Sequence, residues 1–363
     1  MSRNGMSRNI LQRTRASATA LIVLTLCVAS AAVAETPSCV PPSGQQLIIY
    51  RSGSLSPTFK PLIAELTCQT GIQVTDVTGG GVDMGRQITA GGHACDLYAS
   101  ADYEDIDVFM KPAGYANFNI VFAQGKMVLA YSASSVAERK LPPIADPNQP
   151  FNPPVSIPNA TAKWYENLLM PGVKVGGGIP YLDPGAYRTF LIFQLMEAYY
   201  KVPNLYNDLL EHLVIPGFDP SAGPSLGKRF DYQFMYEHGA QVMASKNPDF
   251  RYVNVPDEIN MSDPAKNAYY REHAVIVLPG LDTPSSARSV PVTGTRVAWG
   301  ITLMKNAPNR ENAIKFLQLL LSPTGTAMLK EKGPAPISPA LVSPADFRKL
   351  PESLRPLVKT MGK

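Results

Sequence analysis

The chain is poor in the residues on which most catalytic metal and nucleotide sites depend. Among 363 residues there are only 4 histidines and 4 cysteines. The histidines are scattered, with no HExxH pair or other paired metal-ligand spacing, and the GxxxxGK[ST] loop of P-loop enzymes is absent. We therefore expect His93, His212, His238 and His273 to be surface or packing residues, and the pattern indicates neither a zinc hydrolase nor a P-loop NTPase.

An excess of positive charge is also lacking once the first residues are set aside. The chain has 33 lysines and arginines against 29 aspartates and glutamates. Four of the basic residues and none of the acidic ones lie in the first 34 residues, which leaves 29 of each sign in the remainder. Proteins that bind a phosphate backbone need a clustered basic face, so we expect no nucleic-acid partner.

The first residues have the pattern of a secretory leader. Four arginines precede an apolar stretch around Leu21 to Val28, and that stretch ends in Ala32-Val33-Ala34. It is too short and wrongly flanked for a permanent membrane span. We expect a signal peptide over residues 1–34, cleavage after Ala34, and a periplasmic chain that does not span the membrane.

Three cysteines would remain after this cleavage, namely Cys39, Cys68 and Cys95. An exported chain meets an oxidising compartment, where two of them could pair. The sequence does not decide which two. All three fall near the expected base of the first sheet and away from Ser54, which favours a structural disulfide over a reactive thiol.

The run LIIYRSGSLSPTFKPLIAEL at residues 47–66 predicts a place to hold an anion. A buried strand passes through a tight turn at Ser52–Ser54 into a helix, with Ser56 as N-cap and Pro57 as the first helical residue. Helix N-termini carry unpaired N–H groups and a partial positive charge, so amides and a hydroxyl converge without any lysine or arginine. A serine in such a connection often serves the turn alone.

Strands and helices alternate along the chain, which predicts parallel pairing within sheets. A proline-rich stretch at residues 141–158 indicates the passage into a second lobe, where Asp183-Pro184 opens a long helix over residues 185–200. We expect the other helices at residues 82–90, 102–110, 308–322 and 324–332, the last of them ended by Gly333. The expected strands are GIQVTDV, ACDLYAS, NIVFAQ, KMVLAYS, GVKVGGG, FDYQFMY, YVNVP, AVIVLPG and TRVAWGITLMK.

These patterns predict an α/β protein with two lobes, each a mixed, mostly parallel sheet flanked by helices, joined by two hinge crossings. We expect lobe 1 over residues 45–130, lobe 2 over residues 131–295, and a return to lobe 1 with C-terminal helices over residues 296–363. Each lobe would aim helix N-termini into the cleft between them. Closure about the crossings would bury a small ligand.

Several candidate site residues also have a purely structural explanation. Asp183 before proline is a favoured helix start, and a bare carboxylate would repel a dianion. Either its oxygen joins the shell of a metal centre, or it points away and positions the amides behind it. Tyr236 alternates with apolar neighbours and by pattern alone is a packing residue. The glycine runs at 79–81 and 176–178 fit turns as well as ligand cradles.

An enzyme is not expected, although residues 223–227 read GPSLG and match the GxSxG motif of hydrolases. The nucleophile elbow needs a strand before the serine and a helix after it, whereas the loop PGFDPSAGPS leads into Ser225. A secreted hydrolase acting through Ser225 is the alternative from a different functional class.

Seven segments resemble, in order, the tungstate/molybdate-binding proteins of ABC importers. The resemblance runs from about Leu47 to about Gly333 and implies a type II periplasmic binding protein, monomeric and without catalytic activity or cofactor. Such a protein captures a tetrahedral oxyanion and delivers it to a permease and its ATPase. The segments are LIIYRSGSLS, DLYASADY, NIVFAQGKMVLAYS, DPGAYR, DYQFMYEHGA, VPDEINMSDP and VAWGITLMKNAPNRENAIKFL.

The resemblance also implies a ligand set. Two departures from the family pattern leave the coordination number and the identity of the anion open, and another anion or small solute is the alternative ligand. Gly81 stands where the family commonly has a serine, so a hydroxyl donor is lost and only its backbone N–H is left as a predicted contact. The family's glutamate ligand falls in a shortened segment near Asp219. The implied contacts are Gly53 and Ser54 in lobe 1, and Asp183, Pro184, Gly185 and Tyr236 in lobe 2, with Asp183 a candidate ligand of the metal centre.

Overall fold

A computed structural model describes residues 39–145, 159–215, 226–227, 229–281 and 289–362. The expected signal peptide, Asp219 and Ser225 lie outside these residues. The chain from Cys39 onward forms one compact unit. Within the described ranges, no helix combines the length and the apolar character that a membrane crossing requires.

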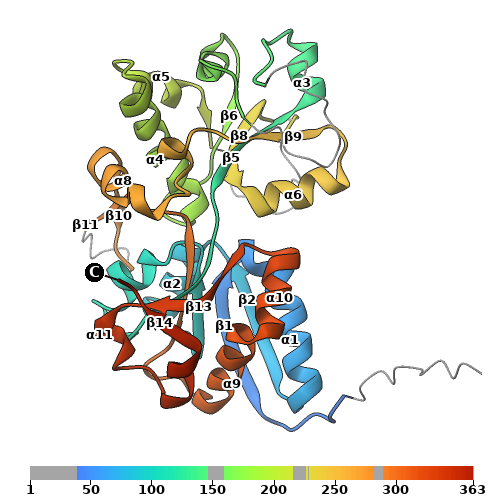
Figure 1. The fold of residues 1–363 in the computed structure, drawn as a ribbon, viewed down its shortest axis with the longest axis vertical. Helices are drawn as coiled ribbons and strands as arrows, with labels where there is room; N and C mark the ends of the chain where they lie inside the picture. The colour runs from blue at the N-terminus through green and yellow to red at the C-terminus, as the bar shows by residue number, and fades with distance from the viewer. Residues whose placement is uncertain (1–38, 146–158, 216–225, 228, 282–288, 363) are drawn as a thin grey trace, which may run out of the picture. The chain divides into compact units, whose positions relative to one another are not determined.

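The first sheet has seven strands in the order β14-β13-β4-β12-β3-β1-β2 (Figure 1). β1 runs parallel to β2 and β3, while β12 runs antiparallel to β3 and β4, so the sheet is mixed as expected. The strands are β1 (Gln46–Ser52), β2 (Gln73–Gly79), β3 (Leu97–Ser100), β4 (Ile120–Gln124), β12 (Ala298–Leu303), β13 (Ala335–Val342) and β14 (Val358–Thr360).

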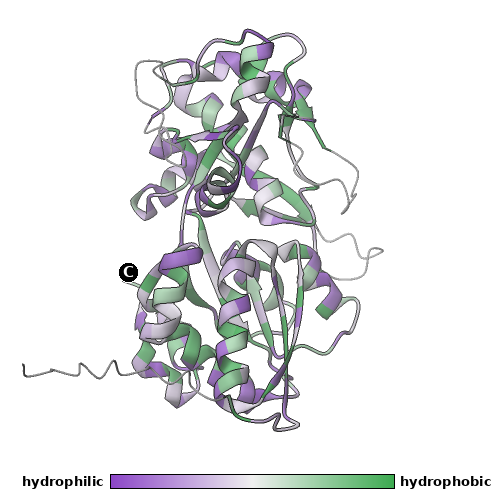
Figure 2. Cartoon of the chain, turned by 90° about the vertical axis from the view of Figure 1, so that its right-hand side faces the viewer, coloured by the Kyte–Doolittle hydropathy of each residue, from purple (hydrophilic) through white to green (hydrophobic). Residues whose placement is uncertain are grey.

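Helices cover this sheet, and its strands carry the apolar core, which Figure 2 shows as green strands between the helices. The ring of Phe59 in α1 packs against Phe122 of β4 and Phe316 of α9, and α10 packs against both helices. The helices are α1 (Ser56–Thr70), α2 (Gly81–Thr89), α9 (Arg310–Leu321), α10 (Pro323–Lys332) and α11 (Pro344–Phe347), with helical turns at Gly53–Leu55, Ile106–Met110 and Glu352–Leu357.

The second sheet has five strands in the order β7-β6-β8-β5-β9. β5 lies between β8 and β9 and is antiparallel to both, so half of the strand pairs in this sheet are antiparallel. The strands are β5 (Met127–Ser132), β6 (Val175–Gly176), β7 (Leu213–Val214), β8 (Tyr232–Tyr236) and β9 (Phe250–Val253). The helices are α3 (Ala133–Glu138), α4 (Pro184–Tyr200), α5 (Leu205–Glu211), α6 (Glu237–Lys246), α7 (Asp257–Asn260) and α8 (Asn267–His273), with 3-10 turns at Trp164–Leu169 and Pro264–Lys266.

The chain passes between the two sheets twice. Gly125 and Lys126 separate β4 in the first sheet from β5 in the second, and residues 294–297 lead from β11 into β12. The exact lobe bounds stay a prediction. The expected strand AVIVLPG forms as β10 (Val275–Pro279), but it pairs only with β11 (Ser289–Thr293) among the described strands and joins neither sheet.

Some local predictions were wrong, each for a tertiary reason. Ser56 is not the N-cap of α1, because Leu55 holds that position and the Ser56 hydroxyl accepts a hydrogen bond from Arg51 (2.8 Å). Gly81 is not a loop residue but the first residue of α2. The sequence patterns predicted no strand after Gly333, yet β13 and β14 form one edge of the first sheet.

The expected structural disulfide is present and joins Cys39 to Cys68. It ties the segment before β1 to α1 of the first lobe. Cys95 is a free, buried thiol, and burial raises its pKa. A low pKa is what makes a cysteine reactive, so this thiol has the character of an inert core residue.

Candidate binding site

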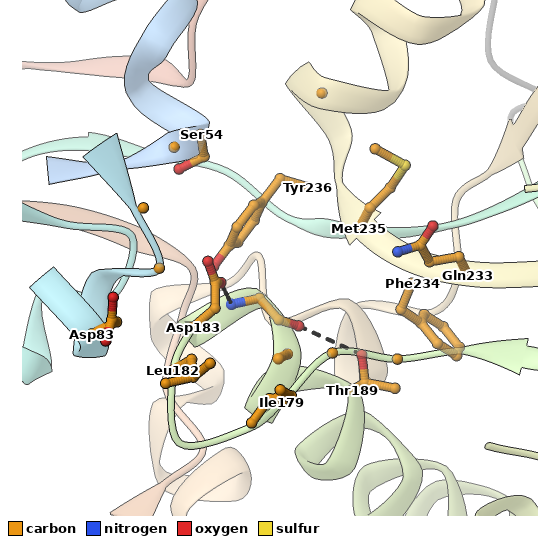
Figure 3. Close-up of a pocket in the computed structure, with 18 of the residues that line it drawn as sticks. Ser54, Asp83, Ile179, Leu182, Asp183, Thr189, Gln233, Phe234, Met235 and Tyr236 are labelled. Carbon is orange, nitrogen blue, oxygen red and sulfur yellow. Dashed lines mark hydrogen bonds between the residues drawn. The ribbon is translucent and has the colours of Figure 1, made fainter. Parts of the chain in front are cut away.

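A cavity of about 1040 Å³ is lined by residues from both lobes (Figure 3). Five of the seven predicted contact residues line it, namely Gly53, Ser54, Asp183, Gly185 and Tyr236. The other two, Gly81 and Pro184, lie against each other instead, since a Cβ built on Gly81 would come within 3.2 Å of Pro184 Cδ. Residues far apart in the sequence therefore meet at one place.

On the first-lobe side, Ser54 sits in the 3-10 turn Gly53–Leu55 between β1 and α1. Its hydroxyl oxygen accepts a hydrogen bond from Trp299 Nε1 at 3.0 Å, and its carbonyl oxygen contacts His238 Nε2 at 3.1 Å. A carbonyl can only accept, so this histidine nitrogen carries the proton. Sequence reasoning assigned His238 to packing or the surface and missed Trp299, because neither lies near Ser54 in the chain.

On the second-lobe side, Asp183 is the N-cap of α4, as its position before Pro184 predicted. Its Oδ1 accepts from the Gly185 N–H at 2.6 Å (dashed in Figure 3). Burial raises the pKa of Asp183, while hydrogen bonds from the Gly185 and Ala186 amides oppose that shift. The capping role is thus present in the structure, and it uses one of the amides that a helix start offers to a ligand.

Tyr236 ends β8 and presents a neutral phenol to the cavity. Its ring packs against Trp299 at a centroid distance of 5.0 Å and stacks with His238 at 6.0 Å. Burial raises its pKa, and the Arg188 guanidinium beside its hydroxyl opposes that shift. Figure 3 shows this ring directed toward Asp183. Because a guanidinium can only donate, the proton of the Tyr236 hydroxyl is not used by Arg188 and is available to a ligand.

The tip of α2 touches the second lobe where Gly80 and Gly81 remove side chains. The Asp83 N–H donates to the Leu182 carbonyl at 3.0 Å, and a Cβ on Gly80 would lie 2.3 Å from that oxygen. A Cβ on Gly81 would lie 2.6 Å from both Ser52 Oγ and Ser100 Oγ. The space for a serine at position 81 is therefore already taken by two other serine hydroxyls, a relation that spacing along the chain does not reveal.

A buried ion pair joins the two lobes. Arg188 of α4 pairs with Asp102, which follows β3, at 2.7 Å between Nη2 and Oδ2, and both side chains are buried (0% and 1% exposed). Tyr187 donates to the same carboxylate at 2.7 Å, and Arg188 Nη1 donates to the Thr295 carbonyl at 3.1 Å. These residues lie in the segments DPGAYR and DLYASADY, which carry the family resemblance. The sequence did not predict the ion pair, because its two partners are far apart in the chain.

The charged residues that line the cavity are all acidic in the described part of the chain. Among the described residues that line it, the charged side chains are Asp83 and Asp183, and none is lysine or arginine. Arg51 lies close by in β1, but its guanidinium is fully buried and pairs with Asp76 at 2.6 Å. Binding of an anion here would rest on amides and hydroxyls, as the sequence predicted.

A family model for the bacterial extracellular solute-binding proteins matches residues 47–334. The chain belongs to this family. It is 28% identical, over 344 residues, to the molybdate/tungstate-binding protein of Pyrococcus abyssi, which covers 86% of this chain and 90% of that protein. The resemblance drawn from the seven segments is confirmed.

Solved structures show the same fold. The sulfate-binding protein of Mycobacterium tuberculosis aligns with a TM-score of 0.55 at 14% identity, covering 87% of this chain and 94% of that one. The periplasmic molybdate-binding protein of Azotobacter vinelandii aligns with a TM-score of 0.51 at 17% identity, covering 80% and 98%. The predicted type II periplasmic binding protein fold is thereby confirmed, and this family and fold are those of substrate-binding proteins rather than enzymes.

Proposed function

We propose that this solute-binding protein captures a tetrahedral oxyanion, molybdate or tungstate, in the cavity and delivers it to the permease and ATPase of an ABC importer. It would act as a periplasmic monomer after cleavage at Ala34. One observation carries the proposal: Ser54, Asp183, Gly185 and Tyr236 come from distant parts of the chain and line one cavity, whose described lining contains no lysine or arginine. The names of the relatives support the choice of anion.

Each residue has a distinct role in this proposal. Ser54 donates its hydroxyl proton, and the amides of its turn add donors at a helix start. Tyr236 donates its hydroxyl proton from the second lobe. Asp183 holds the start of α4 with one carboxylate oxygen and offers the other to the metal centre, whose shell can expand whereas that of sulfur in sulfate does not. This would distinguish metal oxyanions from sulfate.

Neutral donors are strong enough for tight capture. A hydrogen bond to a charged group contributes about 1.5–3 kcal/mol net, so about six such bonds give roughly 9–18 kcal/mol before the cost of association and closure. Nanomolar binding requires about 12 kcal/mol. The estimate leaves room for the loss of the one serine donor at position 81.

Calorimetric titration of the leaderless protein with molybdate, tungstate, sulfate and phosphate tests the proposal. We expect sub-micromolar binding of a metal oxyanion, and Ser54→Ala should weaken it by about 1–3 kcal/mol because a buried charge loses one donor. Ser245→Ala on the outer part of α6 is the matched control and should bind normally. If the wild-type protein binds neither molybdate nor tungstate with a sub-micromolar dissociation constant, the assigned ligand is rejected.

The size of the cavity supports a second candidate, an organic anion. Four oxygens need roughly 100 Å³ at about the share of a water molecule each, far below the cavity volume of about 1040 Å³. Pockets of about 300–1,000 Å³ hold ligands of drug size. Apolar side chains, among them Phe234, Met235 and Met243, line part of the wall. A small phosphorylated or carboxylated compound that binds more tightly than molybdate in the same titration would favour this candidate.

A further inference from the structure

We infer that Trp299 and His238 are positioning residues that fix Ser54 as a hydrogen-bond donor to the bound anion, an inference that rests on the proposed function. Both contact Ser54 directly, and they come from different lobes. Trp299 belongs to β12, the strand that follows the second crossing, whereas His238 lies in the first turn of α6. The two residues bind different atoms of the same serine.

Trp299 determines what the Ser54 hydroxyl can do. The indole N–H is a donor only, and it points at Ser54 Oγ at 3.0 Å from a side chain that is fully buried. With one oxygen lone pair engaged in this way, the hydroxyl proton is directed to another acceptor. The donated hydrogen bond also polarises the hydroxyl, because linked hydrogen bonds strengthen one another in a medium of low dielectric. Ser54 lines the cavity, so an anion bound there would be the acceptor of its hydroxyl proton.

His238 holds the backbone of the same residue from the second lobe. Its Nε2 donates to the Ser54 carbonyl at 3.1 Å, and the ring is 9% exposed. Burial lowers its pKa to about 4, so the ring is neutral at pH 7 and adds no charge to the wall of the cavity. The bond fixes the peptide that carries the serine when the two lobes are together.

Ring packing makes the arrangement stiff. The Tyr236 ring lies 5.0 Å from that of Trp299 and 6.0 Å from that of His238, and the latter two are 5.2 Å apart. The edge of the six-membered ring of the indole is close to Gly125 of the first crossing, where a Cβ would lie 3.0 Å from it. The simpler explanation is that Trp299 only fills the core. Trp299→Phe distinguishes positioning of Ser54 from core packing, because it keeps an aromatic ring and removes the N–H.

A double-mutant cycle with molybdate and tungstate as probes tests the role of Trp299. A neutral hydrogen bond of about 0.5–1.5 kcal/mol predicts that Trp299→Phe weakens binding about 2–12-fold. In a Ser54→Ala background the same change should have less than about a twofold effect, because the group through which it acts is gone. Equal effects in both backgrounds overturn the inference, as they would assign the tryptophan to packing alone.

His238 is tested by a conservative and a disruptive variant. His238→Gln keeps a side-chain N–H donor and should bind molybdate within about threefold of wild type, whereas His238→Phe keeps the ring and should lose about 2–12-fold. Equal loss in both variants contradicts the positioning role. Thermal unfolding of each variant shows whether a loss of binding merely reflects a loss of folded protein.

A ligand-free readout separates failure of this inference from failure of the proposed function. The chain has 2 tryptophans, so Trp164→Phe leaves Trp299 as the sole indole emitter. Adding Ser54→Ala removes the hydrogen-bond acceptor of the indole and should shift its emission to shorter wavelength without any anion present. An unchanged emission overturns the inference. A shift in a protein that binds neither metal oxyanion supports the contact while rejecting the ligand.

Discussion

Ser54 illustrates how a short side chain gains function from its neighbours. On its own it is a turn residue of ordinary chemistry. The buried indole of Trp299 donates to its hydroxyl oxygen, and the His238 ring donates to its carbonyl. The hydroxyl proton then has to find another acceptor, which in our proposal is the ligand. Gly81 works in the opposite way, because its lack of a side chain makes room for the hydroxyls of Ser52 and Ser100.

At the residue scale we predict that Gly81→Ser, which restores the residue common in the family, does not improve binding of molybdate. A Cβ there would lie 2.6 Å from two hydroxyl oxygens, and overpacking of this kind costs about 1–3 kcal/mol. Chemical denaturation should show this loss of stability, and calorimetry should show no gain in affinity. Gly362→Ser, where a Cβ meets nothing within 4 Å, is the control and should be neutral. A tighter complex with unchanged stability would contradict the prediction.

At the scale of an element, α4 combines three tasks in its first two turns. Asp183 caps it, Gly185 reaches the cavity, and Tyr187 and Arg188 bind Asp102 of the other lobe. The sequence predicted the cap and the helix because both depend on local backbone chemistry. The ion pair depends on what lies opposite, so it emerged only from the fold.

We predict that two substitutions of Asp183 separate its capping role from its proposed ligand role. Asparagine caps helices as well as aspartate, so Asp183→Asn should keep stability, whereas Asp183→Ala should lose about 1 kcal/mol. Both should bind molybdate and tungstate more weakly, because the carboxylate ligand is gone, while sulfate binding by Asp183→Asn should not weaken. Denaturation and calorimetry provide the two readouts. Unchanged affinity of Asp183→Asn for both metal oxyanions would leave only the capping role.

At the scale of the whole molecule, the Arg188–Asp102 pair links the lobes through two buried charges. It lies beside Thr295 of the second crossing, whose carbonyl accepts a hydrogen bond from Arg188. Burial of both charges makes the pair costly to form, but removing one partner leaves the other unpaired in the interior. The link therefore constrains how the two lobes meet.

We predict that Arg188→Met lowers the free energy of unfolding by about 3–5 kcal/mol, because Asp102 then keeps a buried charge without its cation. Lys163→Met removes an ion pair whose side chains are 70% and 58% exposed, and it should change stability by less than about 1 kcal/mol. Urea denaturation of both variants checks the contrast. Similar small effects in the two variants would show that the buried pair contributes little.

Hydrophobic periodicity, helix starts and glycine-rich turns determined much of the fold in advance. Local signals of this kind predicted five of the seven strands of the first sheet, α4 with its Asp183 cap, and the position of Ser54 at a strand-to-helix turn. They missed β13 and β14, because strands at the edge of a sheet are recognised by their partners rather than by their own pattern. The Ser56 cap was wrong because Arg51, brought near by the fold, takes its hydroxyl.

By itself the sequence determined that the chain belongs among the solute-binding proteins, because that follows from ordered segments along the chain, and it predicted which residues would line the site. Only the tertiary structure decided that Cys39 pairs with Cys68, that Gly81 has no room for a side chain, and that Trp299 and His238 hold Ser54. These relations join positions up to 245 residues apart in the sequence. Contacts over such separations depend on how the sheets and helices pack, which no local propensity encodes.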